Sequence, residues 1–197
     1  GPTKATAPHL RRGAAEILFE TVGLTPFSAK MCVAINALAM DPHEDVRFVV
    51  AKRLMNLREP ASGLMRHIVE WFVRNETNVV VWAGFGDTVG ALGHDLPDEM
   101  ALICKVAFER FRDEEHARAA REIFLSHLVQ IYVNSGSPAA KGLLFELIRR
   151  PGESGMSVLA HHVVPWAAQK GLARVFRDRT LGVLDALVGA TTLTFAA

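Results

Sequence analysis

The chain has 197 residues, of which 50% are hydrophobic, with 22 Lys and Arg against 21 Asp and Glu and with two Cys. This composition excludes an intrinsically disordered chain, and a chain of this length buries enough apolar surface to fold without disulfides or a structural metal. The net charge of +1 excludes the strongly basic surface on which non-specific nucleic-acid binding depends.

Apolar side chains recur at helical spacing along most of the chain, and Pro, Gly, Asn or Asp stand at the breaks. The pattern predicts an all-α fold. Its ten predicted helices span 9–22, 27–40, 42–57, 62–74, 77–93, 97–112, 114–133, 138–150, 154–170 and 172–189.

The ends of the chain depart from this pattern. Residues 1–8 begin Gly1-Pro2, like the remnant of a cleaved tag, and we expect them to form a disordered start. Residues 191–197 alternate Thr with apolar residues, which predicts an extended tail. We interpret 9–190 as a single domain.

Several predicted helices begin with a proline in the first turn. In Thr25-Pro26, Asp41-Pro42 and Ser137-Pro138 a side-chain acceptor precedes the proline, which is typical of a helix N-cap. Glu44 follows Asp41 at the spacing of a capping box. We therefore expect Thr25, Asp41 and Ser137 to cap the helices that follow them.

The helices form two interleaved series. Those that begin near 42, 77, 114 and 154 are separated by 35, 37 and 40 residues, and those near 27, 62, 97 and 138 by 35, 35 and 41. A regular step of this length predicts stacked helical hairpins. A compact helical bundle is the alternative, since helical periodicity alone fits both.

The segment 45–54 resembles the second helix of a HEAT repeat, in which an Asp opens the helix and a Val-Arg pair stands in its first turn. Here the three residues are Asp45, Val46 and Arg47. A weaker echo is His116-Ala117-Arg118, whereas the middle unit, Asn78-Val79-Val80, lacks the arginine.

This resemblance to the HEAT-like (ARM/HEAT) superfamily covers about residues 27–170. It implies a right-handed superhelical stack, an α-solenoid, of about four HEAT-like helical hairpins. The helices at 9–22 and 172–189 would then act as caps.

Residues 79–90 combine a β-branched run with Gly84, Gly86 and Gly90, as the start of a dinucleotide-binding loop does. Such a loop needs a second strand beyond the glycines, but 99–112 has helical spacing. We interpret the glycines as a helix surface on which a neighbouring helix packs closely.

The segment 86–90, Gly-Asp-Thr-Val-Gly, is faintly similar to the catalytic motif of HEAT-like alkylpurine DNA glycosylases. That motif presents a catalytic Asp, and Asp87 stands in the matching position. Gly90 replaces its second Asp, and Phe85-Gly86 replaces its Trp pair, so the parts that perform the chemistry are missing.

The resemblance implies a non-catalytic scaffold or adaptor that binds another protein on the concave surface of the stack. The candidate surface residues are Lys52, Asn56, Trp82, Asp87, Arg118, Arg121, Gln169 and Lys170. Their mixed charge suits a protein better than a phosphate backbone. The alternatives are a nucleic-acid-binding protein, a glycosylase-like enzyme with a concave-face pocket, and an accessory sensor domain of a larger regulatory protein.

We expect no cofactor and no metal, because the His and Cys residues lack the spacing of metal ligands. Cys32 and Cys104 both stand in apolar stretches, which indicates buried thiols in a reducing compartment. No apolar run has the length of a membrane span, and no secretory signal is present. These features predict a cytoplasmic protein with no membrane partner, and they leave its oligomeric state open.

Overall fold

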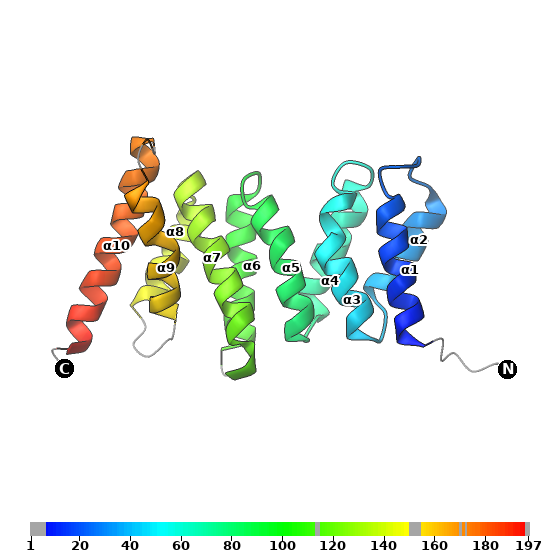
Figure 1. The fold of residues 1–197 in the computed structure, drawn as a ribbon, viewed down its shortest axis with the longest axis horizontal. Helices are drawn as coiled ribbons and strands as arrows, with labels where there is room; N and C mark the ends of the chain where they lie inside the picture. Colours follow the sequence, from blue (N-terminus) through cyan, green and yellow to red (C-terminus); the bar gives the residue numbers. More distant parts are fainter. Residues whose placement is uncertain (1–6, 113–114, 150–154, 170, 172, 196–197) are drawn as a thin grey trace. The chain divides into compact units, whose positions relative to one another are not determined.

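The computed structural model describes residues 7–112, 115–149, 155–169, 171 and 173–195, which form ten α-helices and two short 3-10 helices (Figure 1). The all-α prediction is confirmed. The α-helices are α1 (Pro8–Thr21), α2 (Ala29–Ala39), α3 (Glu44–Arg53), α4 (Ser62–Asn75), α5 (Val79–Leu92), α6 (Pro97–Arg110), α7 (Arg118–Ser135), α8 (Pro138–Ile148), α9 (Gly155–Ala168) and α10 (Arg174–Phe195). The 3-10 helices are η1 (Leu54–Leu57) and η2 (Glu115–Ala117).

The chain divides into two compact units, residues 1–88 and 89–197, where the sequence predicted one domain over 9–190. The boundary falls inside α5. Unit 1 therefore contains α1 to α4 and α5 as far as Thr88, and unit 2 contains the rest.

In unit 1, helices α1, α2 and α3 pack on one another around Ala15, Val46 and Leu38. Aromatic rings join the next two helices, because Phe85 meets Phe72 and Trp82 edge to face, with ring centroids 5.8 and 5.7 Å apart. All three rings are buried, so their contacts contribute apolar stabilisation where α4 and α5 meet.

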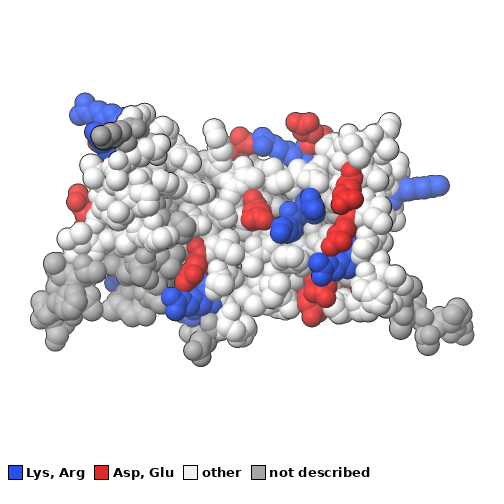
Figure 2. All heavy atoms as spheres, viewed as in Figure 1, with Lys and Arg blue, Asp and Glu red and all other residues white. Residues whose placement is uncertain are grey.

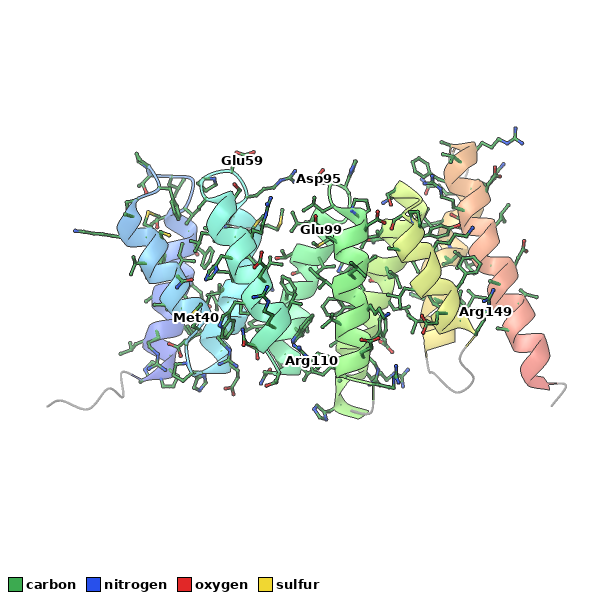
Figure 3. The ribbon with its side chains drawn as sticks, turned by 180° about the vertical axis from the view of Figure 1, so that it is seen from behind. Met40, Glu59, Asp95, Glu99, Arg110 and Arg149 are labelled. Atoms are coloured by element: carbon green, nitrogen blue, oxygen red, sulfur yellow. The ribbon has the colours of Figure 1, made fainter. Side chains whose placement is uncertain are left out.

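In unit 2, α7 is the central helix. It contacts α6, α8, α9 and α10, and eight of its residues are buried, which explains why its apolar residues lie on more than one face. The charges of α6 match its dipole, because Asp98 and Glu99 lie in its first turn and Arg110 in its last. Figure 3 shows Glu99 and Arg110 at opposite ends of this helix.

One of the three predicted caps is confirmed. The Ser137 hydroxyl accepts from the Ala140 amide at 3.0 Å, and Pro138 opens α8. The other two predictions are wrong, since Ser28 caps α2 in place of Thr25, and His43 caps α3 in place of Asp41. Helix α2 begins at Ala29 and α3 at Glu44, each two residues after the start predicted at 27 or 42.

The glycine-rich segment is helical. A β-carbon at Gly84 would lie 2.8 Å from the Phe48 ring, and one at Gly90 would overlap the His127 ring. Both contacts are closer than a side chain tolerates, so these two glycines let a neighbouring residue approach the α5 backbone, as predicted, and do not form a nucleotide-binding turn.

The predicted extended tail differs from the structure. Helix α10 continues to Phe195, so residues 191–195 are helical. Residues 196 and 197 of the predicted tail lie outside the described residues, and so do residues 1–6 of the predicted disordered start. A Thr lowers helix propensity by only about 0.5 kcal/mol relative to Ala, so a segment that contains Thr can still continue a helix.

Candidate functional site

In three helices a side chain of the first turn caps the C-terminal end of the preceding α-helix. The fourth residue of α3, α5 and α7 is in each case a side-chain donor that binds a backbone carbonyl at or just after the preceding helix end. The pairs are Arg47 Nη1 with Asp41 O (2.7 Å), Trp82 Nε1 with Glu76 O (2.9 Å) and Arg121 Nη1 with Phe111 O (2.5 Å).

The donor is not the same residue type in the three helices. In α5 the indole of Trp82 donates, whereas α3 and α7 use an arginine. In α7 the residue that matches Arg47 is Arg121, three positions beyond the predicted Arg118. The three donors are 35 and 39 residues apart, in line with the predicted repeat length.

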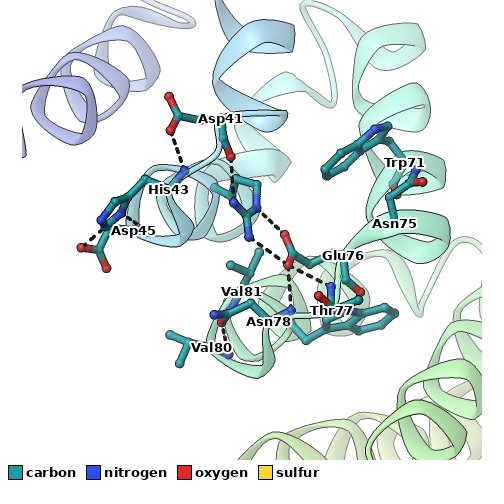
Figure 4. A network of polar contacts seen from close by, with 12 residues as sticks. Asp41, His43, Asp45, Trp71, Asn75, Glu76, Thr77, Asn78, Val80 and Val81 are labelled. Atoms are coloured by element: carbon teal, nitrogen blue, oxygen red, sulfur yellow. Dashed lines mark hydrogen bonds and ion pairs between the residues drawn. The ribbon is translucent and has the colours of Figure 1, made fainter. Parts of the chain in front are cut away.

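The carboxylate of Glu76 is the centre of a polar network in unit 1 (Figure 4). Glu76 is 2% exposed and binds Arg47 through both oxygens, Nε to Oε2 at 2.6 Å and Nη2 to Oε1 at 3.2 Å. It also accepts from the Thr77 and Asn78 amides at 3.0 and 2.8 Å. We call Arg47, Glu76, Asn78 and Trp82 the Glu76 clasp.

The Glu76 carboxylate stabilises the charged form of the Arg47 guanidinium. The hydrogen bond to Glu76 is the main cause that raises the pKa of Arg47 above its ordinary value, and burial opposes it. Because a guanidinium and two amides donate to the two oxygens of the carboxylate, Glu76 has a structural role.

The predicted surface residues of unit 1 have different environments. Lys52, Asn56 and Asp87 are exposed, as a binding surface requires. Asn56 lies one turn after Lys52, and its amide donates to the Phe19 carbonyl at 3.3 Å, which ties η1 to α1. Trp82 is 1% exposed and supplies no surface, because the predicted surface position is a core position.

The predicted surface residues of unit 2 lie on α7 and after α9. Arg118 is 62% exposed and pairs with Glu122 at 2.8 Å, one turn along α7. Arg121 is occupied in capping α6. Gln169 is exposed directly after α9, and Lys170 lies outside the described residues.

The face drawn in Figure 2 carries basic and acidic side chains beside one another. Several ion pairs join residues one helical turn apart, among them Arg12 with Glu16 and Lys105 with Glu109. Such pairs leave little net field to attract a charged ligand, and each stabilises the fold by at most about 1 kcal/mol.

An open apolar groove of about 640 Å³ lies between α1 and α2 in unit 1. Its lining is apolar except for one threonine and the ion pair that closes one end, Arg11 Nε to Asp41 Oδ2 at 2.8 Å. The lining residues are Arg11, Ala14, Ile17, Leu18, Thr21, Ala34, Ala37, Leu38 and Asp41.

Several large hydrophobic side chains of α1, α2 and the turn between them are exposed. Ile17, which lines the groove, is 64% exposed, Leu10 on α1 is 60% exposed, Val33 on α2 is 71% exposed, and Leu24, in the turn after α1, is 81% exposed. Exposed apolar residues that gather in one place mark binding surfaces more often than scattered ones do.

No protein-family model, curated protein or solved structure matches this chain.

The chemistry of the site must therefore be judged from the structure itself. Within the described ranges, no cluster of three or more His, Cys, Asp or Glu could hold a metal ion. Cys104 is fully buried, and burial raises the pKa of its thiol, so the unreactive protonated form dominates at neutral pH.

The helices that the structure describes include none long and apolar enough to cross a membrane.

Sequence reasoning missed the groove between α1 and α2. Leu10, Ile17 and Val33 occupy apolar positions of the helical pattern, and periodicity treats every such position as a core position. A signal was present in α1, where exposed Leu10 and Ile17 form a stripe distinct from the stripe of buried Ala15 and Phe19.

Proposed function

We propose that this chain is a non-catalytic protein-interaction module built from HEAT-like helical hairpins. The repeated donor at the fourth residue of α3, α5 and α7 supports a hairpin repeat, because a compact bundle does not require the same capping geometry every 35 to 39 residues. Within unit 2, α6 contacts α7 and α8, and α7 contacts α8 and α9, which is the pattern of neighbours expected in a stack.

The groove between α1 and α2 is the observation that carries the binding function. Its lining includes the small side chains of Ala14, Ala34 and Ala37 together with Ile17, which is 64% exposed. A groove with a mostly apolar lining that includes small residues accepts the apolar face of a helix. Exposed surface of this kind is stabilised by burial against another chain.

The exposed residues of the predicted surface belong to the same proposal as further polar contacts, Lys52, Asn56 and Asp87 in unit 1 and Arg118 and Gln169 in unit 2. Each is polar or charged and lies on or directly after the second helix of a predicted hairpin. Polar contacts at the rim of an interface are weakened by a charge reversal such as Lys52→Glu, and more at low salt than at high salt.

Site-specific photocrosslinking tests the groove. A photoreactive amino acid at Val33, which is 71% exposed, should form a covalent adduct with a protein in cells that express the full chain. Ile17→Asp should abolish the adduct, because it places a charge in an apolar contact. Leu102→Asp is the matched control, since Leu102 is 58% exposed on α6 and lies outside the groove. The absence of any protein adduct, or its survival in Ile17→Asp, would contradict the proposal.

A further inference from the structure

The exposed apolar residues of α1 follow the spacing of a helix–helix seam. Leu10, Ala14, Ile17 and Thr21 are separated by four, three and four residues, which keeps them on one side of the helix. Leu10 and Ile17 are 60% and 64% exposed, so this seam faces solvent in unit 1.

A second seam of the same kind runs along α2. Val33, Ala37 and Met40 are separated by four and three residues, and Figure 3 shows Met40 at the end of the helix. Val33 is 71% exposed and Met40 37%. The groove lies between the two seams, so two helices that approach this face would each meet a seam, as in a four-helix bundle.

The charges beside the seams are complementary to each other. Glu20 is near the end of α1 and Lys30 near the start of α2, and because the two helices run antiparallel, both lie at the end where the connecting turn is (Figure 1). Both side chains are exposed, and in the part of the chain that the structure describes neither forms an ion pair.

A second copy of the chain provides a partner helix for each seam and an opposite charge for both Glu20 and Lys30. Rotation by a half turn about an axis parallel to the helices sets α2 of the second copy against α1 of the first, with both turns at the same end. Lys30 of the second copy then lies beside Glu20, and the symmetry produces the same pair a second time. An unrelated helix would have to supply both matches independently.

We propose that the face formed by α1 and α2 binds a second copy of this chain in a two-fold symmetric dimer, in which α1 of each copy packs against α2 of the other. This inference rests on the proposed function, because it names the occupant of the groove. The exposed side chains Leu10, Ile17, Leu24, Val33 and Met40 offer on the order of 500 Å² per copy, and the two copies together reach the lower bound of about 1,000 Å² for a specific interface.

Measurement of the mass in solution tests the dimer. Light scattering of the full chain at about 100 µM should give twice the 21.6 kDa of one chain. Ile17→Asp should raise the dissociation constant by about 100-fold or more, because symmetry buries two carboxylates. Leu102→Asp should remain dimeric, and circular dichroism should show both variants to be equally helical. A wild-type chain that is monomeric, or equal masses for the two variants, would overturn the proposal.

Charge reversal tests the geometry without placing a charge in the apolar face. Glu20→Lys and Lys30→Glu should each weaken the dimer by about 5-fold to 10-fold at low salt, since each sets like charges together twice. The double variant should recover most of the wild-type affinity. A double variant that dimerises no better than either single variant would refute the pairing of α1 with α2 of the other copy.

The crosslink at Val33 separates this inference from the proposed function. An adduct of twice the chain mass supports the dimer, and an adduct with a different protein, together with a monomeric wild-type chain, overturns the dimer while the groove stands as a protein-binding surface. If no adduct forms and the chain is monomeric, both proposals fail.

Discussion

The Glu76 clasp and the groove between α1 and α2 lie in the same unit but differ in how their side chains are satisfied. In the clasp, the Glu76 carboxylate is 2% exposed and has a guanidinium and two amides as donors. In the groove, Ile17 is 64% exposed among apolar neighbours. The clasp is complete within one chain and stabilises the fold, whereas the groove gains its stabilisation only from contact with another chain.

The largest effect is expected when the clasp is broken. Glu76→Ala should lower the free energy of unfolding by about 3–5 kcal/mol, because the Arg47 guanidinium, only 14% exposed, loses its ion-pair partner. Urea denaturation followed by circular dichroism measures this change. Glu59→Ala is the control, since Glu59 is exposed (Figure 3), and it should change the same quantity by less than about 0.5 kcal/mol. Equal losses in the two variants would show that the clasp does not stabilise the fold.

A smaller effect is expected when only one donor of the clasp is removed. Trp82→Phe keeps an aromatic ring in the core but leaves the Glu76 carbonyl without the indole donor, which should cost about 1–3 kcal/mol. The same substitution at Trp71, which is half-buried on α4, should cost less in the same denaturation experiment. If Trp71→Phe were the more damaging change, the capping role of Trp82 would be ruled out.

The smallest effect on stability is expected in the groove. Measured at a concentration low enough for the chain to be monomeric, Ile17→Asp should change the free energy of unfolding by less than about 1 kcal/mol, because the side chain is mostly in water already. Ile35→Ala, at a fully buried position on α2, should cost about 2–5 kcal/mol. A large loss for Ile17→Asp would mean that the groove belongs to the core and not to an interface.

Helical periodicity predicted all ten helices, because each helix buries at least one regular face and is interrupted by Pro, Gly, Asn or Asp. Cap chemistry was less reliable. Asp41 was expected to cap α3, but it pairs with Arg11, 30 residues earlier in the chain, and accepts from the His43 amide. A tertiary contact of this kind cannot be recognised from local sequence. Asp41 is bound by Arg11, and His43, two residues later, accepts from the Asp45 amide and caps α3.

The sequence alone did not separate surface from core at the candidate site. The exposed candidates are Lys52, Asn56, Asp87, Arg118 and Gln169, whereas Trp82 is buried and its indole donates to the Glu76 carbonyl at the end of α4. The groove was not predicted, since a pattern of apolar residues does not tell which face of a helix has a neighbour. That information comes from the packing of α1 on α2 and α3, which leaves Leu10 and Ile17 uncovered.

The donors at the fourth residue of α3, α5 and α7 also bear on the order of folding. Each reaches a carbonyl only six, six and ten residues earlier in the chain, whereas Arg47 reaches Glu76 across 29 residues. Contacts between residues close in sequence form with little loss of chain entropy. We therefore expect these capping hydrogen bonds to form before contacts between residues far apart in the chain, such as that of Arg47 with Glu76. In rapid-mixing experiments Trp82→Phe should therefore slow refolding, while Glu76→Ala should mainly accelerate unfolding.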